Sequence, residues 1–385
     1  MACLPQLRFQ LFKQVVIPTS QFAKYSLLTD VKYSGKKKGK KVNVNKSEDF
    51  SEQMLTLYKR KLLEFDKCLN TAAEDFYKIS PKVRKYRNKI FNSIKSAVVG
   101  DSDRSVFMIG SSGSGLASES SDIDLVVFTS KDAKLREKNK QILSSKTLLR
   151  KYMHNLARRI GKCCPNDFDC NDISIISNAR VPILVLQTKK NLKIEIQLNS
   201  ENCLRNTLFL RNIVMKDSRI PVLIFWAKEW LRTLNLKNSK LGLFSSYHTA
   251  LLDKLIQFTE DDLACDISPN APLEVVISRL SAAQPPIIKV NRDLQPSVTE
   301  LILHFIDYYS TLDFHKVHIF AASSVVKKRP ENEFDETLCI TDPFSTSTIC
   351  LVKNGANLFA EAVAFTKRSM LAGKGLSWPM NFLGS

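Results

Sequence analysis

The stretch Gly110–Phe128, GSSGSGLASESSDIDLVVF, allows two very different structures. Its first half consists mainly of glycine and serine, a composition typical of flexible linkers. Its second half places Asp122 and Asp124 two residues apart, at the start of an apolar run that predicts a β-strand. The stretch is therefore either a hinge between domains or a loop that holds phosphate beside a metal site.

Two common phosphate-binding patterns do not match this stretch. A P-loop requires lysine and then serine or threonine after its last glycine, whereas Leu116 and Ala117 follow Gly115. The dinucleotide-binding pattern requires a third glycine at the position of Ser118. The sequence instead predicts a strand, a Gly-Ser turn, a short segment of small residues and a second strand.

The two aspartates predict a cation site. Alternate residues of a strand point to the same side, so Asp122 and Asp124 project together while Ile123 faces the core. Adjacent carboxylates repel each other unless a cation lies between them, and oxygen ligands suit Mg²⁺. The alternation over Leu192–Leu198 puts Glu195 on the polar face of another strand, where it can supply a third carboxylate. The alternative is an incidental glutamate on a surface strand.

The net charge of the chain indicates which classes of partner it binds. Its 385 residues include 57 Lys and Arg against 38 Asp and Glu, a net charge of +19. This balance favours a polyanionic partner, either nucleic acid or an anionic membrane surface. No apolar run approaches the roughly 18 residues that a membrane helix needs, so we expect no membrane span. The nine cysteines lack zinc-site spacing, which favours reduced thiols in an intracellular protein.

The N-terminal segment, residues 1–50, differs in composition from the rest. Residues 32–46 contain seven lysines and no acid, which predicts a solvated, disordered tail that can add phosphate contacts or act as an import signal. The first 29 residues contain no acid but only one arginine, a weak likeness to a mitochondrial transit peptide. We expect a cytoplasmic protein, with the nucleus and the mitochondrion as alternatives.

Hydrophobic periodicity predicts an α+β fold, with a small α/β domain inserted into a mostly helical one. The expected helices are Glu52–Ile79, Pro81–Val99, a long basic stretch over Asp132–Lys162, Ile220–Leu234, Ser245–Thr259, Val298–Tyr309 and Leu358–Leu371. The expected strands are Val106–Ile109, Ile123–Phe128, Asp172–Ile176, Val181–Gln187 and Leu192–Leu198, the last two joined by a hairpin turn. Residues 266–297 contain five prolines and are interpreted as a loop.

Gly110-Ser111 followed by Asp122 and Asp124 resembles the nucleotidyltransferase signature of the DNA polymerase β superfamily. The chain is more narrowly similar to the template-independent RNA nucleotidyltransferases of the cytoplasmic-type poly(A) polymerase and terminal uridylyltransferase family. Further segments resemble that family in the expected order: Ala179–Ile183, Leu204–Thr207, Ala227–Trp230, Leu243–Tyr247, Leu301–Tyr309 and Thr341–Phe344. The similarity extends over roughly residues 52–372.

This resemblance implies a polymerase-β-like domain organisation and a metal-dependent activity. Residues 1–50 would be the basic segment, 51–85 the first helices of a central domain, 86–204 the catalytic domain and 205–385 the helical central, poly(A)-polymerase-associated domain. The active cleft would lie between the last two. The chain would add ribonucleotides from NTPs to RNA 3′ ends without a template, using two Mg²⁺ or Mn²⁺ ions.

The resemblance also assigns roles to individual residues. Asp122, Asp124 and Glu195 would be the catalytic metal ligands, and Gly110 and Ser111 would hold the triphosphate. Lys228 and Arg232, four apart on one helix face, would bind the β- and γ-phosphates, and Asn206 would contact the ribose. Tyr247 would stack on the base and Ser246 would touch a phosphate or the base edge.

The sequence departs from this family at two places. Glu195 stands where the family has aspartate, which moves the carboxylate by roughly 1.5 Å, and a misplacement of about 1 Å can cost ~10²-fold in rate. A catalytically impaired scaffold is therefore an alternative function. Ser347 and Cys350 occupy base-selecting positions where adenylating members have Asn and Arg, and the histidine of uridylyltransferases is absent. Strict U-addition is disfavoured, and adenylation or mixed-nucleotide tailing is favoured.

Two further expectations concern partners. No RNA-recognition fold, zinc knuckle or KH loop is visible in the sequence. Diffuse positive charge predicts salt-sensitive, sequence-tolerant RNA binding, so a separate RNA-binding or scaffold protein would select the transcript. A relative that acts on small substrates is a third hypothesis, opposed by the charge of +19.

Overall fold

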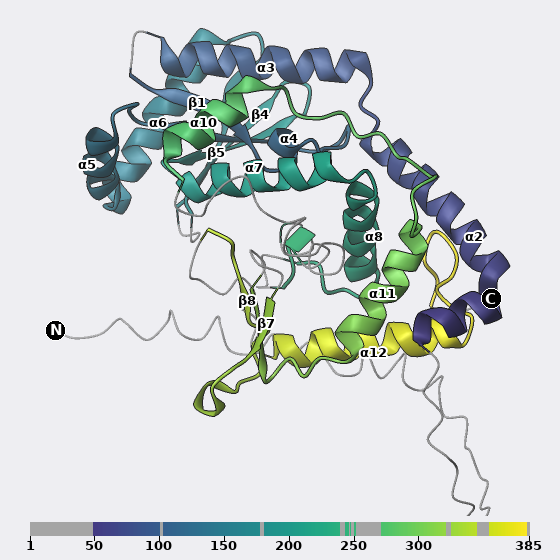
Figure 1. The fold of residues 1–385 in the computed structure, drawn as a ribbon. Helices are drawn as coiled ribbons and strands as arrows, with labels where there is room; N and C mark the ends of the chain where they lie inside the picture. Colours follow the sequence, from purple (N-terminus) through teal and green to yellow (C-terminus); the bar gives the residue numbers. More distant parts are fainter. Residues whose placement is uncertain are drawn as a thin grey trace, which may run out of the picture.

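The structure, a computed structural model, describes residues 49–100, 103–177, 181–238, 243–245, 247, 250–251, 271–320, 325–344 and 354–382 (Figure 1). Several predictions concern residues outside these ranges. They are almost the whole basic segment before residue 49, most of the helix expected over Ser245–Thr259, and the side chains of Ser246, Ser347 and Cys350.

A five-stranded mixed sheet forms the upper part of the molecule in Figure 1. Its strands are β1 (Ser105–Ile109), β2 (Ile123–Phe128), β3 (Phe168–Ile176), β4 (Ile183–Thr188) and β5 (Lys193–Leu198), in the order β1-β2-β5-β4-β3. Strands β2 and β5 are parallel, and the other neighbours are antiparallel. The five predicted strands are thus confirmed, as is the β4–β5 hairpin, whose turn places Asn191 at φ 60°.

Two helical layers cover the sheet. Helices α3 (Pro81–Val99) and α6 (Lys146–Cys163) pack on the face that carries Ile123, Leu125 and Val127. Helices α7 (Glu201–Lys216) and α10 (Leu273–Ala282) pack on the opposite face, against Val126 and Phe128. Because side chains alternate along β2, Asp124 belongs to the α7 and α10 side of the sheet.

The loop interpretation of residues 266–297 is wrong for Leu273–Ala282, which form α10. Leu273, Val276 and Leu280 are spaced three and four residues apart and are all buried, as on one helix face. Pro272 lies at the N-cap and Pro285 follows the helix, so the prolines bound the helix and do not break it.

The long basic helical stretch is two helices, α5 (Ala133–Leu143) and α6, with Ser145 as the N-cap of the second. Helix α7 was not predicted, nor was a second sheet of three short strands. This sheet contains β6 (Val317–Phe320), β7 (Val325–Lys328) and β8 (Ile340–Thr341), in the order β7-β6-β8, and the 3-10 turn η2 (Glu331–Glu333) follows β7.

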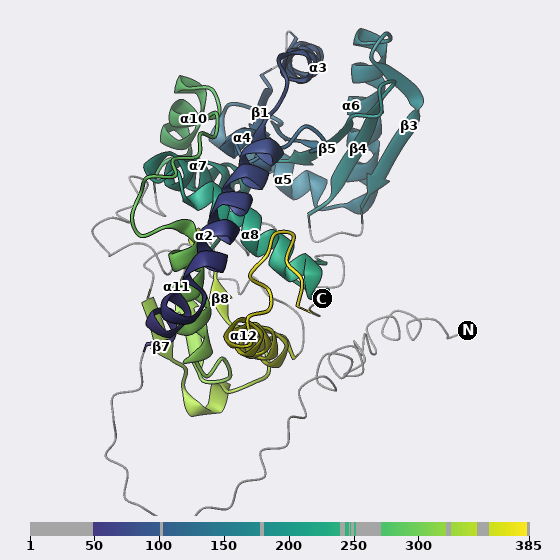
Figure 2. The same ribbon diagram turned by 90° about the vertical axis from the view of Figure 1, so that its right-hand side faces the viewer.

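A helical body forms the other end of the molecule. It contains α2 (Phe50–Tyr77), α8 (Ile220–Thr233), α11 (Val298–Ser310) and α12 (Gly355–Leu371), four helices predicted from periodicity. Its aromatic centre includes the stacked pair Trp226 and Trp230, with ring centroids 5.5 Å apart. Helix α7 lies between this body and the five-stranded sheet, and α2 runs along one side from α3 to α12 (Figures 1 and 2).

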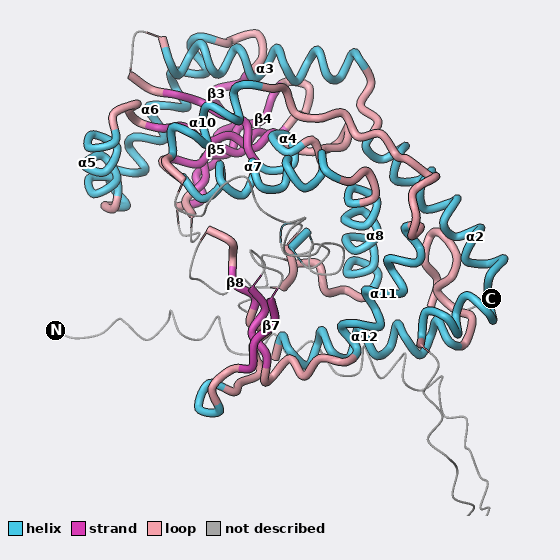
Figure 3. The backbone as a smooth tube through the Cα atoms, in the orientation of Figure 1, coloured by secondary structure: helices cyan, strands magenta, loops and turns pink. Residues whose placement is uncertain are grey.

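The two sheets lie at separate places in the fold, with the helices between them (Figure 3). The larger sheet supplies the strand ends of the site described below, and the smaller one packs on the helical body through Ile319 and Ile340. In the described part of the chain, no helix has the length and the apolar character that a bilayer crossing requires.

Candidate active site

Three carboxylates meet at the adjoining ends of β2 and β5. Asp124 on β2 and Glu195 on β5 are direct register partners of the parallel pair. Asp122 lies just before β2, and its Oδ2 is 3.1 Å from the Lys193 ammonium, which also contacts Oε1 of Glu195. The structure therefore brings together the three acids that the sequence singled out.

The electrostatics of this trio favour a cation. Burial, followed by the charges of Glu195 and Asp122, raises the pKa of the Asp124 carboxyl from 3.8 to about 7. The nearby positive charges of Lys193 and Arg87 act in the opposite direction on this pKa but do not offset the rise. An ionised Asp124 is therefore costly here unless a positive charge comes closer.

Lys193 supplies positive charge to the trio. Its ammonium hydrogen-bonds to Glu195 and to Asp122, and these bonds raise the pKa of Lys193 above its usual range. Among the described residues, no three His, Cys, Asp or Glu side chains are already gathered closely enough to hold a metal ion. The donor set nevertheless fits a hard divalent cation, because it is all oxygen and one carboxylate is buried beside two like charges.

The Gly-Ser stretch between β1 and β2 is folded tightly against the carboxylates. Its first part forms one helical turn, α4 (Gly110–Ser114). Gly110 has φ +59°, and a Cβ atom there would lie 2.6 Å from Oδ2 of Asp124. A Cβ at Gly113 would lie 2.6 Å from the Thr207 side chain on α7. The glycines permit close packing, so the hinge alternative is excluded.

Arg87 on α3 holds the segment that leads into β2. Its guanidinium donates to the carbonyl oxygens of Ser121 and Asp122, the latter at 3.0 Å, and to Oγ of Ser112 at 3.0 Å. The side chain is buried, and burial lowers the pKa of Arg87, although the charges of Asp122 and Asp124 counteract this. The sequence reasoning missed Arg87, because its partners are main-chain atoms distant in sequence.

A second buried arginine holds the other end of the turn. Arg211 on α7 donates from Nε and Nη2 to the carbonyl oxygen of Gly113, at 2.9 and 2.6 Å. Its Nη1 donates to the carbonyls of Leu280 and Ala283, each at 3.0 Å. Arg211 thus ties the Gly-Ser turn to the end of α10, and it too was missed by the sequence reasoning.

The predicted nucleotide-binding residues lie on α4, α7 and α8. Gly110 and Ser111 begin α4, directly beside Asp124. Asn206 on α7 donates from Nδ2 to Oδ2 of Asp342 at 3.3 Å, so α7 contacts the segment Thr341–Phe344. The Asn206 Oδ1 atom is buried and has no hydrogen-bond partner within the described ranges.

The predicted phosphate-binding cations come from an element separate from the carboxylates. Lys228 and Arg232 both lie on α8, where Lys228 is half-buried and Arg232 is exposed and paired with Glu229. Lys237 lies near Glu229 and Arg232, and burial lowers its pKa, so it is a third cation that the sequence reasoning missed. Tyr247 is partly buried and packs against the large aromatic core.

Comparison with known proteins finds relatives of this chain. Residues 53–215 match the family described as poly(A) RNA polymerase, mitochondrial-like, central palm domain. The chain is 25% identical over 280 residues to poly(A) RNA polymerase GLD2 of Danio rerio and 23% identical over 253 residues to the Homo sapiens protein of that name. These alignments cover 69% and 62% of this chain and 54% and 50% of the relatives.

The chain is similar to template-independent RNA nucleotidyltransferases of the DNA polymerase β superfamily. Solved structures agree at the level of the fold. The structure of mtPAP in complex with UTP has a TM-score of 0.59 at 16% identity, covering 88% of this chain and 73% of the other. The GLD-2/RNP-8 complex gives a TM-score of 0.58 at 16% identity, covering 79% and 94%. The chain spans about half the length of the curated relatives it matches.

Proposed function

We propose that this chain adds ribonucleotides from NTPs to the 3′ end of RNA without a template. The observation that carries the proposal is the register match of Asp124 and Glu195 on parallel strands, with Asp122 beside them. The likeness to the poly(A) RNA polymerases and the net charge of +19, which suits a polyanionic substrate, support it.

Asp122, Asp124 and Glu195 would hold the divalent ions, Mg²⁺ or Mn²⁺. Such ions, when bound, lower the pKa of the RNA 3′-hydroxyl and stabilise the charge of the leaving pyrophosphate. Gly110 can adopt a positive φ, and because it has no Cβ atom the Asp124 carboxylate can lie close to the turn. Arg87 fixes the carbonyl of Asp122 and hence the entry into β2. The chain thus contributes preorganised ligands.

The remaining predicted contacts concern the incoming nucleotide. The amides of Gly110 and Ser111 would bind the triphosphate, and Asn206 would contact the ribose through the oxygen that has no partner within the described ranges. Lys228 and Arg232 would neutralise the β- and γ-phosphates, with Lys237 as a further cation near Arg232. Binding of phosphate by Arg232 would compete with its ion pair to Glu229.

Base choice stays a prediction from the sequence. Ser347 and Cys350 replace the Asn and Arg of adenylating members, and Tyr247 with Ser246 would contact the base. We favour adenylation or mixed-nucleotide tailing over strict U-addition. We also propose the domain division at residues 50, 85 and 204, and a cytoplasmic location.

A separate RNA-binding protein would select the transcript. Another protein of this fold, GLD-2, forms a complex with RNP-8. The purified chain alone should therefore discriminate weakly between RNA sequences at physiological salt. Strong sequence discrimination by the isolated chain would contradict this part of the proposal.

The second candidate function is a catalytically impaired scaffold. The observation that favours it is Lys193, which already pairs with Asp122 and with Glu195 in the third-acid position. A divalent ion and the Lys193 ammonium would compete for the same carboxylate oxygens of Asp122 and Glu195. Activity therefore requires that divalent ions displace Lys193.

One assay separates the two functions. The chain is incubated with a labelled RNA oligonucleotide, Mg²⁺ or Mn²⁺, and each NTP singly and mixed. Extension that disappears in Asp122→Ala and Asp124→Ala establishes catalysis by this site. No extension with any NTP and either metal, by protein that retains its fold, refutes the catalytic proposal and favours the scaffold.

A further inference from the structure

A cavity of about 570 Å³ lies beside the edge strand β1, away from the carboxylates. Helix α3 forms one wall, and residues 283–288, which follow α10, form the other. Val106, Phe107 and Met108 of β1 line its floor. Asp122, Asp124 and Glu195 are not among its lining residues. We name this cavity the β1 groove.

The β1 groove is lined by positive charge alone. Arg84, Arg87, Lys95 and Arg211 line it, and no aspartate or glutamate does. Arg87 and Arg211 already donate to main-chain carbonyls. The side chains of Arg84 and Lys95 form no hydrogen bond or ion pair with any other described residue. Nζ of Lys95 lies 6.0 Å from the centroid of the Phe91 ring, so both charges are available to a ligand. An anionic occupant complements this lining.

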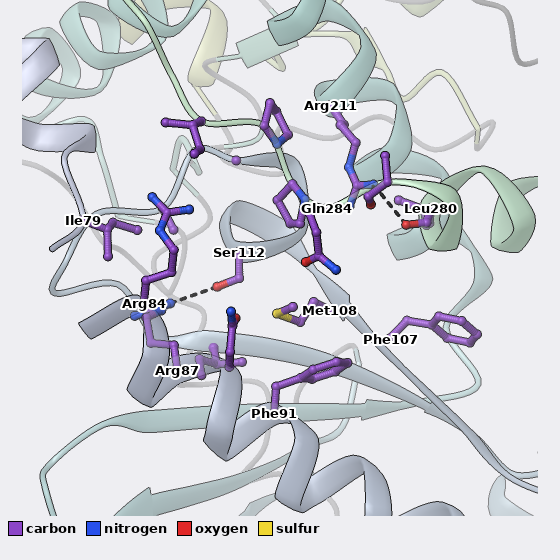
Figure 4. A pocket seen from close by; sticks show the side chains of 18 of the residues that line it. Ile79, Arg84, Arg87, Phe91, Phe107, Met108, Ser112, Arg211, Leu280 and Gln284 are labelled. Atoms are coloured by element: carbon purple, nitrogen blue, oxygen red, sulfur yellow. Dashed lines mark hydrogen bonds between the residues drawn. The ribbon is translucent and has the colours of Figure 1, made fainter. Parts of the chain in front are cut away.

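Carboxamide side chains line both walls of the groove. Asn88 and Asn92 lie on the same stripe of α3 as Arg84 and Lys95, and Gln284 comes from the opposite wall. Figure 4 shows Gln284 pointing toward Met108, with Arg84, Arg87 and Phe91 on the helix across from it. Within the described chain these three amides make no hydrogen bonds to other residues. A carboxamide offers a donor and an acceptor, as a peptide bond does.

The floor of the groove is a free strand edge. β1 pairs with β2 on one side, and in the described sheet no strand pairs with its other side. Unpaired strand edges hold a row of backbone donors and acceptors that an extended peptide can match. RNA has no comparable repeating amide, so the edge and the carboxamides of the groove favour a peptide over a nucleic acid strand.

We propose that the β1 groove binds an extended, acidic segment of a partner protein, which adds as a strand beside β1. Its carboxylates would pair with Arg84 and Lys95, and its apolar side chains would contact Phe91 and Phe107. The inner end of the groove is formed by Arg87 and Ser112, which also hold the entry to β2. A bound segment therefore contacts the residues that position Asp122.

Binding is tested with a defined probe, without NTP or RNA. The probe is a fluorescein-labelled ten-residue peptide that alternates Glu with Val or Phe, and its matched control has Lys in place of every Glu. The acidic peptide should bind the full chain, and the Lys peptide should not. The double change of Arg84→Glu with Lys95→Glu should weaken binding about tenfold or more. Equal binding of the two peptides would refute the proposal.

The control variant carries Lys82→Glu with Lys85→Glu. These exposed residues lie on the same helix and make the same charge change, but they do not line the groove. Binding should be within about twofold of the wild type, because only long-range charge is altered. A loss equal to that of the groove variant would mean that net charge alone attracts the peptide, and the groove assignment would be wrong.

Hydrogen exchange on the unmodified chain tests the strand addition itself. The acidic peptide should slow exchange of amides within Ser105–Ile109, since new backbone bonds form there. Unchanged exchange in β1 despite binding would overturn the assignment. Displacement of the peptide by stoichiometric RNA oligonucleotide, or by inorganic phosphate at equal concentration, would mean that the groove is a nucleic acid or phosphate site instead.

Discussion

The Gly-Ser turn and the carboxylate trio contact each other at Gly110. They differ in how far the fold itself satisfies their polar and charged groups. The turn is held by two buried arginines whose hydrogen bonds go to Ser121, Asp122, Ser112 and Gly113. The trio places like charges together and raises the pKa of Asp124 to about 7. The hydrogen-bonding groups of the turn are satisfied by the fold itself. The carboxylates of the trio require a positive charge, either from a bound cation or from Lys193.

This difference separates residues that stabilise the fold of the site from residues that would bind the metal ions. Changes in the turn should disturb stability and geometry together, because its hydrogen bonds are part of the fold. Changes in the trio should relieve repulsion in the metal-free protein while removing metal ligands. Stability and activity should therefore respond in opposite directions in the trio and in the same direction in the turn.

The largest expected effect is the loss of nucleotide addition in Asp124→Asn. The amide is neutral and ligates divalent ions weakly, so several kcal/mol of charge stabilisation are lost. We expect a decrease in the extension rate of about 10³-fold or more. Single-turnover extension of labelled RNA measures it, with circular dichroism as the folding control. A rate within about tenfold of the wild type would mean that Asp124 is no metal ligand.

The same variant should be more stable than the wild type in the absence of metal. Asp124 has a pKa of about 7 in the folded chain, whereas an unfolded chain releases this proton near pH 3.9. Stability from the protonated carboxyl is therefore present at low pH and lost as the pH rises toward 7. The lost free energy is roughly 4 kcal/mol at most.

Urea unfolding in EDTA at several pH values tests this sign. The advantage of Asp124→Asn over the wild type in free energy of unfolding should be smallest near pH 4 and grow until about pH 8. An advantage that does not change with pH would show that Asp124 is not buried beside like charges. Added Mg²⁺ should reduce the advantage, since only the wild type binds it well.

A third effect concerns Arg87, where stability and activity should fall together. Arg87→Met keeps the length of the side chain but removes the guanidinium donor of the Ser121 carbonyl and one of two donors of the Asp122 carbonyl, the other being Oγ of Ser112. We expect a loss of about 2–4 kcal/mol in the free energy of unfolding and a decrease in rate of about 10–100-fold through misplaced Asp122.

The matched control is Arg84→Met, one helical turn earlier on α3. Arg84 makes no hydrogen bond to the entry of β2, so stability should change by less than about 0.5 kcal/mol. Arg87→Lys should restore part of the stability, because one ammonium can replace some of the donated bonds. If Arg87→Met were as stable and as active as Arg84→Met, the holding role of Arg87 would be refuted.

The sequence could predict the trio but not the groups that hold the turn. Asp122, Asp124 and Glu195 follow from strand alternation, which is local and survives in the fold. Arg87 donates to atoms about 35 residues away, and no local pattern distinguishes it from Arg84 on the same helix. Its role depends on how α3 packs against β1 and β2, which is set by tertiary contacts.

The same reasoning explains the errors in the secondary structure. The five prolines of 266–297 predict a loop when only their number is considered. Their positions allow a helix, because Pro272 and Pro285 lie outside α10 and no proline lies within it. β6–β8 are two to four residues long, too short for alternation to distinguish them from loops. Long helices such as α3, with Ser80 at the N-cap and Pro81 next, were predicted with the correct bounds.

The smallest expected effect concerns Arg232. Its ion pair with Glu229 is exposed to solvent, unlike the buried hydrogen bonds of the turn and the crowded carboxylates of the trio. The Arg232 side chain is 68% exposed, so the pair adds less than about 1 kcal/mol to stability. Arg232→Ala should leave the free energy of unfolding nearly unchanged and raise the KM for NTP by roughly 3–10-fold, because one phosphate contact is lost. The kcat should change little, and high salt should reduce the effect.

Glu229→Gln gives the complementary change. It releases the Arg232 guanidinium from its carboxylate partner and removes a negative charge near the phosphates, so the KM for NTP should fall. Opposite shifts of KM in the two variants, at constant kcat, would assign Arg232 to ground-state binding of the triphosphate. A KM that rises in both variants would mean that the ion pair positions α8, and that Arg232 itself binds no phosphate.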